Sequence, residues 1–213
     1  MPEASGTGTG KGHGHVGKNS PYKKPDQYTK RAKSEGFPAR SVYKLEEIDK
    51  RVRLLRPGQR VVDLGAAPGS WSMYASKILG SSGRLLSIDL SLIEVPLGPN
   101  VTVVQGDALN VDSSLFFEHG PFDVVLSDMA PATTGSRAAD QWRSFELCVK
   151  AIEIAAAHGK PGSSFVGKIF MSEDFQKARD ELRKAFNEVR TLRPETVRKQ
   201  SFEVFLVGLG KKS

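Results

Sequence analysis

Short apolar segments alternate with helical segments along most of the chain, and this alternation is the feature that most restricts the fold. Five runs rich in β-branched and aliphatic residues lie at 60–65, 84–90, 101–107, 122–128 and 163–170. Amphipathic stretches typical of helices lie at 70–79, 143–157 and 173–186. Strands that are apolar on both faces and joined by helices form a parallel sheet covered on both sides. The sequence therefore predicts an α/β fold with a doubly wound, mostly parallel sheet.

The C-terminal part departs from this alternation. After the last helix, VRTLRP at 189–194 and SFEVFLVGLG at 201–210 read as two strands joined by a short connection. Two such strands can pair as an antiparallel hairpin at the edge of the sheet. We therefore expect seven strands, with a Rossmann-like parallel part and a C-terminal antiparallel hairpin.

The N-terminal part divides into a polar tail and a helical segment. Residues 1–25 are rich in Gly, Ser, Thr and Lys and contain almost no large aliphatic residues, so they cannot offset the entropy of ordering. We expect a disordered basic tail over 1–25 and a single domain over 26–213. Within that domain, 26–58 should form an N-terminal segment with a helix from about residue 40, and 59–213 the core.

The basic residues are concentrated near the N-terminus. Residues 1–44 hold nine Lys or Arg against Glu3, Asp26 and Glu35, which is +6 of the net charge of +7. Aromatic residues lie among them at Tyr22, Tyr28, Phe37 and Tyr43. Such a segment is typical of RNA contacts through phosphates and unpaired bases, although a solubilising tail would carry the same charge. We interpret 26–58 as a segment that faces RNA.

Several classes of protein are excluded by composition. The single cysteine, Cys148, allows neither an intramolecular disulfide nor a CxxC zinc or redox site, and His13 and His15 lack the further ligands of a metal site. We expect no metal. The chain shows neither the apolar core of a signal peptide nor a run of about 20 apolar residues, so we expect no membrane contact and a cytoplasmic location.

The turn after the first strand is a candidate ligand site. It reads GAAPG over 65–69, whereas a nicotinamide fingerprint reads GxGxxG, and Pro68 offers no N–H to a phosphate. Glycines alone would also suit an ordinary connection between a strand and a helix. Aspartates lie near the ends of the first three strands, at Asp63, Asp89 and Asp107, and we expect all three to face one crevice. Asp89 could accept hydrogen bonds from the ribose hydroxyls of a nucleoside cofactor, and Asp107 from its adenine amino group.

Three further ionisable residues fall at the same edge of the expected sheet. Asp128 follows the fourth strand and Lys168 ends the fifth. Glu203 lies near the start of the last strand, which reaches this edge if it runs antiparallel to the others. The topology therefore predicts that these residues, far apart in sequence, form one cluster.

The ordered motifs SVYKLEEI, VVDLGAAPGSW, GD at 106–107, VLSDMAP, FVGKIF and SFEVFLV resemble those of the FtsJ (RrmJ) family. That family consists of 2′-O-ribose methyltransferases of large-subunit ribosomal RNA, with relatives that act on tRNA and mRNA caps. The resemblance covers about residues 40–210 and implies the S-adenosylmethionine methyltransferase fold. Three positions depart from the usual pattern: Ser70 in place of a second glycine, the segment 132–135, and Gly167 before the lysine.

The resemblance implies a role for each matching residue. Lys44, Asp128, Lys168 and Glu203 match the catalytic tetrad, with Lys168 as the proton acceptor. The positions that match cofactor contacts are Gly69, Trp71, Asp89, Asp107 and Asp128. Lys44 would favour the neutral form of Lys168 by repulsion, whereas Asp128 and Glu203 would oppose it, so the sequence leaves its protonation state open. No metal is implied.

The expected activity is methyl transfer from S-adenosyl-L-methionine to a uridine 2′-hydroxyl of large-subunit (23S) ribosomal RNA in the assembled subunit, a step of ribosome biogenesis. The expected partner is the large ribosomal subunit, and a monomer is expected. Two alternatives stay open: 2′-O-methylation of tRNA, and a non-catalytic RNA-binding module of the same fold. A nicotinamide oxidoreductase is disfavoured because the GxGxxG turn is missing.

Deletion of residues 1–25 should leave the fold and cofactor binding intact, because the tail lacks the apolar residues needed to join a core. The deletion removes Lys11, Lys18, Lys23 and Lys24 with Glu3. If the tail contacts RNA, the slope of log affinity against log salt should become shallower by up to roughly four units. RNA binding over a salt series for both chains is the measurement, and superimposable lines would remove the tail from the binding surface.

Overall fold

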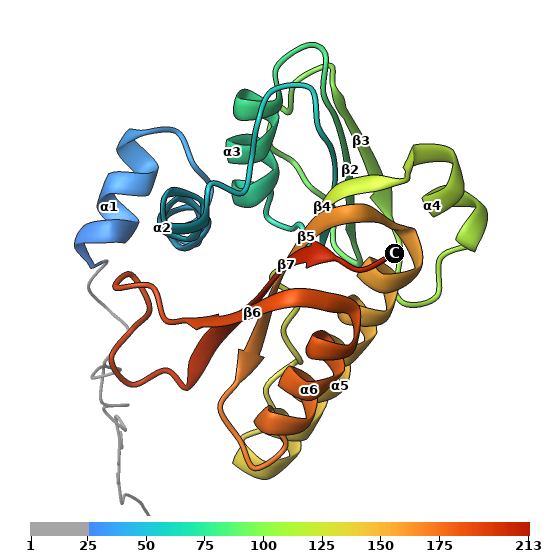
Figure 1. The fold of residues 1–213 in the computed structure, drawn as a ribbon. Helices are drawn as coiled ribbons and strands as arrows, with labels where there is room; N and C mark the ends of the chain where they lie inside the picture. The colour runs from blue at the N-terminus through green and yellow to red at the C-terminus, as the bar shows by residue number, and fades with distance from the viewer. Residues whose placement is uncertain (1–25) are drawn as a thin grey trace, which may run out of the picture.

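The computed structural model describes residues 26–213, and the expectation of a disordered tail over 1–25 lies outside the described residues. Seven strands form one sheet in the order β3-β2-β1-β4-β5-β7-β6 (Figure 1). The strands are β1 (Arg60–Leu64), β2 (Arg84–Asp89), β3 (Val101–Gln105), β4 (Phe122–Ser127), β5 (Gly159–Phe170), β6 (Phe186–Leu192) and β7 (Glu203–Lys211). The first five are parallel, and β7 runs antiparallel between β5 and β6. The predicted fold class is confirmed.

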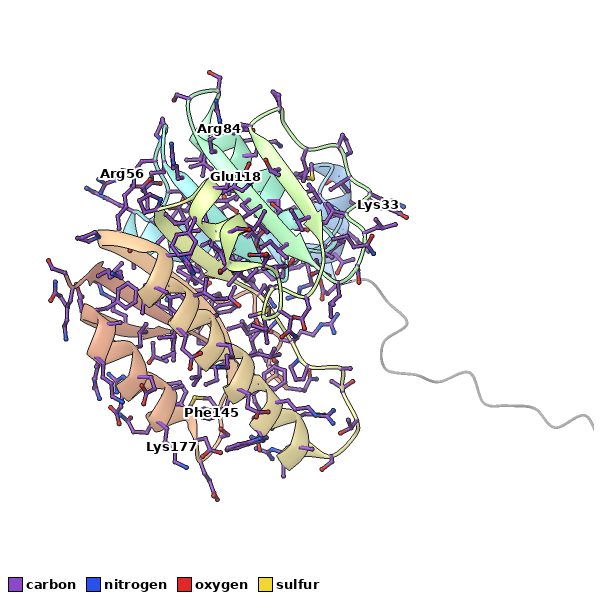
Figure 2. All side chains as sticks on the ribbon, turned by 90° about the vertical axis from the view of Figure 1, so that its right-hand side faces the viewer. Lys33, Arg56, Arg84, Glu118, Phe145 and Lys177 are labelled. Carbon is purple, nitrogen blue, oxygen red and sulfur yellow. The ribbon has the colours of Figure 1, made fainter. Side chains whose placement is uncertain are left out.

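Helices cover both faces of the sheet. They are α1 (Gln27–Ser34), α2 (Val42–Val52), α3 (Ser70–Leu79), α4 (Ser113–His119), α5 (Arg137–His158) and α6 (Phe175–Ala185). Residues of α2 and α3 share one apolar cluster with Val61, Val124 and Val166, whereas α4, α5 and α6 share the other with Val62 and Val125. Side chains alternate between the faces of a strand, so each strand contributes to both clusters. Side chains fill these layers, with Phe145 on α5 and the exposed Lys177 on α6 (Figure 2).

Two helices and one loop differ from the sequence-based expectation. We did not predict α1 or α4, which have only 8 and 7 residues. Such short helices give little periodicity to read, and both depend on an aspartate N-cap, Asp26 or Asp112. The connection between β6 and β7 spans residues 193–202, which is longer than the short turn we predicted. In the sheet, β7 lies inside and β6 forms the edge.

Neither a membrane span nor a metal cluster is found in the part of the chain that the structure describes. No helix between residues 26 and 213 is long and apolar enough to cross a bilayer. Over the same residues, no group of three or more His, Cys, Asp or Glu is arranged to hold a metal ion.

Candidate active site

The carboxyl ends of β4 and β5 bring Asp128 and Lys168 together. Ser127 pairs with Gly167 in the parallel register, so the next residues of the two strands are neighbours. Lys168 Nζ donates to Asp128 Oδ1 at 2.9 Å and also to the backbone oxygen of Asp128. The Lys168 side chain is only 7% exposed, which makes this ion pair largely inaccessible to solvent.

A second ion pair lies over the same face of the sheet. Lys44 Nζ of α2 lies 2.6 Å from Glu203 Oε1 at the start of β7. Lys168 is directly opposite Phe205 in the β5–β7 register, and Glu203 lies two residues before Phe205, so all three side chains share one face. Lys44 Nζ is 5.9 Å from the centre of the Phe205 ring. The four residues predicted as a tetrad therefore meet as two ion pairs around Phe205.

Trp71 and Ser70 hold α2 in place above the sheet. The Trp71 indole N–H donates to the Ser41 carbonyl at 2.9 Å, and its ring packs against Phe205. The Ser70 hydroxyl donates to the Ala39 carbonyl at 3.1 Å and accepts from the Ala39 N–H at 2.9 Å. Sequence reasoning treated Ser70 only as a departure from a glycine. In the structure its hydroxyl ties the chain before α2 to the start of α3, which helps to position Lys44.

Gly167, the departure next to Lys168, has a packing explanation. A Cβ at this position would lie 2.4 Å from Cζ of Phe165. Phe165 is fully buried and packs against Phe186, so its ring has little room to move. A side chain at position 167 would therefore disturb the strand that presents Lys168.

The glycine turn between β1 and α3 forms a tightly enclosed cradle. Gly65 and Gly69 both have positive φ, +75° and +105°. A Cβ at Gly69 would lie 2.5 Å from Val95 Cγ2, and one at Gly65 would lie 2.7 Å from Met129 Cγ. Because Met129 follows Asp128, the turn lies directly against the segment that carries a tetrad residue. A small ligand in the turn would therefore be next to the ion pairs.

Asp89 and Asp107 lie at the carboxyl ends of β2 and β3, as expected. Asp89 accepts from the Ala67 N–H at 2.9 Å and from the Ser91 N–H at 2.7 Å, which places its carboxylate beside the glycine turn. Asp107 accepts from the Leu109 N–H and from the Asn110 amide. A carboxylate has about four acceptor positions. Both can therefore still accept hydrogen bonds, and this set of acceptors fits the hydroxyl and amino groups of a nucleoside cofactor.

Asp63 does not face the crevice, and our expectation for it was wrong. Its side chain is 0% exposed and accepts from the Ser72 hydroxyl at 2.7 Å, while the Ser87 hydroxyl donates to Ser72 Oγ. Burial raises the pKa of Asp63 to about 7, an effect that the Ser72 hydrogen bond opposes. The strand-end pattern could not reveal this, because Asp63 is the penultimate residue of β1 and points under α3.

The two remaining predicted cofactor positions lie close to the turn. Gly69 precedes α3 and is one of the positive-φ glycines. The Trp71 side chain is buried, and its only polar atom already donates to Ser41. A cofactor contact by Trp71 would therefore come from its backbone, and that contact stays a prediction.

A groove of about 1250 Å³ leads from Lys44 and Glu203 to α1 and the loop before β7. Its lining includes the cationic residues Arg40, Arg198 and Lys199. Arg40 contacts the Asp26 carboxylate and the Thr196 carbonyl, so it connects α1, α2 and this loop. The lining also contains the acidic residues Asp26 and Glu195, so the groove has a small excess of positive charge, and it gives a long, anionic molecule a route to the tetrad.

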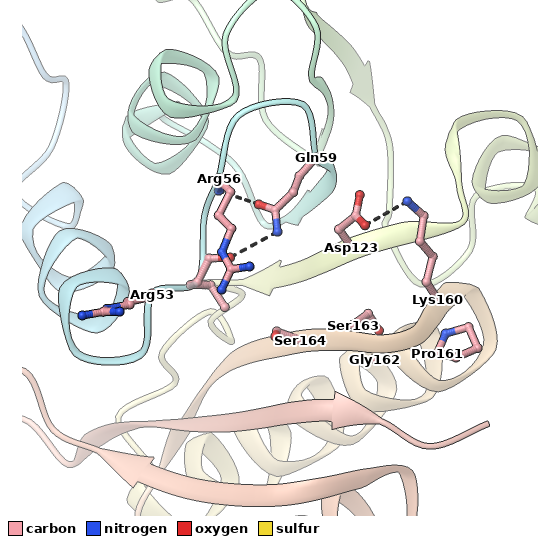
Figure 3. Close-up of a pocket in the computed structure, with 10 residues that line it drawn as sticks. Arg53, Arg56, Gln59, Asp123, Lys160, Pro161, Gly162, Ser163 and Ser164 are labelled. Atoms are coloured by element: carbon pink, nitrogen blue, oxygen red, sulfur yellow. Dashed lines mark hydrogen bonds and ion pairs between the residues drawn. The ribbon is translucent and has the colours of Figure 1, made fainter.

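A second pocket lies at the opposite edge of the sheet, where β4 and β5 begin. It has a volume of about 260 Å³ and is lined by residues such as Arg53, Arg56 and Gly162 (Figure 3). Its Asp123 is paired with Lys160 at 2.8 Å. No tetrad or predicted cofactor residue lines it, so the chemistry is assigned to the carboxyl edge.

Residues 37–211 match the model of the family described as FtsJ-like methyltransferase. The chain belongs to this family. It is 62% identical to the ribosomal RNA large subunit methyltransferase E of Sorangium cellulosum over 91% of this chain and 92% of that protein. The enzyme with the same description from Bdellovibrio bacteriovorus is 51% identical over 90% of this chain and 99% of its own length.

Solved structures show the same fold at low sequence identity. A ribosomal RNA methyltransferase of Plasmodium falciparum, described as putative, superposes with a TM-score of 0.72 at 24% identity, over 82% of this chain and 98% of that one. Fibrillarin of Aeropyrum pernix, solved with natively bound S-adenosyl-L-methionine, gives a TM-score of 0.58 at 14% identity, over 79% and 76% of the two chains. These likenesses support the methyltransferase fold.

The buried Asp63 should make stability depend on pH. Its pKa is raised in the folded state, so the folded protein holds a proton that the unfolded chain has lost between about pH 4 and pH 7. The stabilisation by this proton is therefore greatest at low pH. The free energy of unfolding falls by at most about 1.4 kcal/mol per pH unit as the pH rises towards 7. Urea unfolding of the wild type and Asp63→Asn from pH 4.5 to 8 measures it. The stability of the wild type relative to the variant should fall with rising pH, and a constant difference would contradict the assignment.

Proposed function

We propose that the protein transfers a methyl group from S-adenosyl-L-methionine to a ribose 2′-hydroxyl of large-subunit (23S) ribosomal RNA. The main observation behind the proposal is that two largely buried ion pairs, Lys168–Asp128 and Lys44–Glu203, lie beside the glycine turn. The two relatives described above are both named as large-subunit ribosomal RNA methyltransferases. This name favours ribosomal RNA over tRNA as the substrate, and the intact tetrad disfavours a non-catalytic RNA-binding module.

The cofactor would lie in the crevice formed by the glycine turn and the ends of β2 and β3. Asp89 binds the ribose hydroxyls and Asp107 the adenine amino group, while Gly69 and the Trp71 backbone allow close approach at the turn. Asp128 adjoins both the turn and Lys168, so it contributes to the cofactor site as well as to the tetrad. When bound, the cofactor supplies an electrophilic methyl group on a sulfonium.

Lys168 is the proton acceptor for the ribose hydroxyl. A neutral amine has two hydrogens and one lone pair, and Lys168 already donates to two oxygens of Asp128. The lone pair is therefore the position that remains for the hydroxyl proton. Lys44 and Glu203 hold the ribose in line with the departing sulfur, because positioning supplies much of the rate of a one-step displacement.

The basic groove carries the RNA strand to this centre. Arg40, Arg198 and Lys199 contact phosphates, and the segment 26–58 forms one wall of the path. The substrate is a uridine presented in the assembled large subunit. We place the reaction in the cytoplasm, where subunits are assembled, and propose a monomer, since the tetrad is complete within one chain and does not require a second copy.

Methylation of total RNA with labelled S-adenosyl-L-methionine tests the proposal. Label should appear in large-subunit RNA, and mapping should locate it on a ribose oxygen of one uridine. The reaction should proceed on large subunits taken from cells that lack the enzyme. Label confined to tRNA would overturn the substrate assignment, and no label either in free RNA or in these subunits would overturn the activity.

Lys168→Ala should nearly abolish methyl transfer and leave cofactor affinity almost unchanged, because Lys168 is assigned to the hydroxyl proton. Loss of a general base typically costs about 10²- to 10⁴-fold in rate. Single-turnover kinetics and calorimetric titration of the cofactor give the two quantities. Lys160→Ala is the matched control, because Lys160 lies at the other end of β5 and pairs with Asp123. A Lys168→Ala rate near that of the control would refute the assignment.

Asp89→Ala should weaken cofactor binding. Hydrogen bonds to a charged group contribute about 1.5–3 kcal/mol, so the dissociation constant should rise roughly 10- to 150-fold. Calorimetric titration is the measurement. Asp112→Ala serves as a control, because Asp112 caps α4 and is not assigned to the cofactor site. An unchanged dissociation constant for Asp89→Ala would remove Asp89 from the site.

A further inference from the structure

Phe202 is an exposed aromatic residue at the edge of the active site. It is 45% exposed and immediately precedes Glu203, which is buried in the tetrad. Its carbonyl accepts from the N–H of Met171, which follows the last residue of β5. The backbone at this point is therefore held at the end of the strand that carries Lys168.

Arg137, the first residue of α5, covers one side of the Phe202 ring. Its guanidinium carbon lies 3.8 Å from the ring centre, well within the range of a cation–π contact. Arg137 itself is exposed. Arginine and phenylalanine stacked in this way form a planar, cationic and partly apolar surface. The part of this surface that remains open to solvent has the properties of a site for a flat, electron-rich ring attached to an anionic backbone.

The chemistry assigned to Lys168 places RNA next to this surface. Glu203 and Ser201 line the basic groove, so Phe202 lies in the segment that separates the groove from α5. A strand of RNA with its ribose at the tetrad and a phosphate near Arg40 or Lys199 must direct its bases away from these cations. Phe202 adjoins Glu203 in the chain, but its ring points to the α5 side, where it stacks on Arg137, so the base that stacks on it would be one turned away from the tetrad towards α5.

We infer that Phe202, supported by Arg137, is a stacking platform for an unpaired base at or next to the methylated nucleotide. This inference rests on the proposed function and names a specificity contact that the tetrad does not provide. Stacking recognises the face of a base and not its sequence, so the platform holds a flipped-out nucleotide in position. It also explains why a large apolar side chain is exposed beside a buried carboxylate.

Steady-state methylation of large ribosomal subunits by Phe202 variants tests the inference. Phe202→Ala should lower kcat/KM for the subunit about 5- to 150-fold, which corresponds to the roughly 1–3 kcal/mol of one base–aromatic stack. Phe202→Tyr and Phe202→Trp keep the ring and should retain most of the activity. Cofactor affinity and thermal unfolding of all variants should match the wild type.

Phe117→Ala is the matched control. Phe117 is 72% exposed, and its ring contacts His158, the last residue of α5. Arg137 lies at the opposite end of this 22-residue helix, roughly 30 Å away at 1.5 Å per residue. Phe117 therefore shares exposure and aromatic character with Phe202 but not its location, and its loss should leave kcat/KM unchanged.

Abasic substitutions in a synthetic RNA stem-loop that carries the methylated nucleotide locate the stacked base. Removal of one base at or next to the target should weaken wild-type binding, and the same removal should have little further effect on Phe202→Ala. Equal kcat/KM values for Phe202→Ala and Phe117→Ala, or additive effects at every abasic position, would overturn the platform. Failure of the wild type to methylate large ribosomal subunits would instead refute the proposed function.

Discussion

The antiparallel pairing of β7 with β5 is the constraint on which the active site depends. It places Lys168 opposite Phe205, and Glu203 two residues away on the same face. A register shift of one residue would move Glu203 to the face covered by α5 and α6 and would leave Lys44 without its carboxylate. The β6–β7 hairpin therefore has a catalytic consequence, because only a strand that runs against the others begins where they end.

The helix that supplies Lys44 is held by contacts to the first βα unit. Trp71 and Ser70 both belong to the first turn of α3 and both bind the chain just before or at the start of α2. The same turn begins with Gly69, which allows close approach of a cofactor. One short segment thus sets the position of the proposed cofactor crevice and of Lys44, so in the proposed reaction it also sets the distance between methyl donor and ribose.

The fold and the clustering of Asp128, Lys168 and Glu203 could be predicted from strand patterns that the chain displays directly, whereas Lys44 was added to them by the resemblance to the family. Apolar runs at 60–65 and 122–128 give strands, and strand order places Asp128 and Lys168 at one edge.

Asp63 was misplaced because the sequence shows that a residue is near a strand end but not which face it occupies. The stack of Arg137 on Phe202 could not be seen, because it joins the start of one helix to a loop 65 residues later. The helices α1 and α4 were missed because a capping aspartate in a short polar segment resembles a turn.

In the proposed reaction, the carboxylates of the site favour transfer of the ribose proton to Lys168. Two lysines and two carboxylates are neutral together only when both amines carry a proton. A neutral Lys168 would leave these four groups with one excess negative charge, and taking up the hydroxyl proton would make them neutral while the ribose oxygen gains the methyl group. Asp128 is already positioned to pair with the resulting ammonium, so little reorganisation accompanies the transfer. A buried ion pair is often no more stabilising than well-packed apolar residues of similar volume. We therefore interpret their presence here as a catalytic feature, since the pairing is completed by the proton transfer itself.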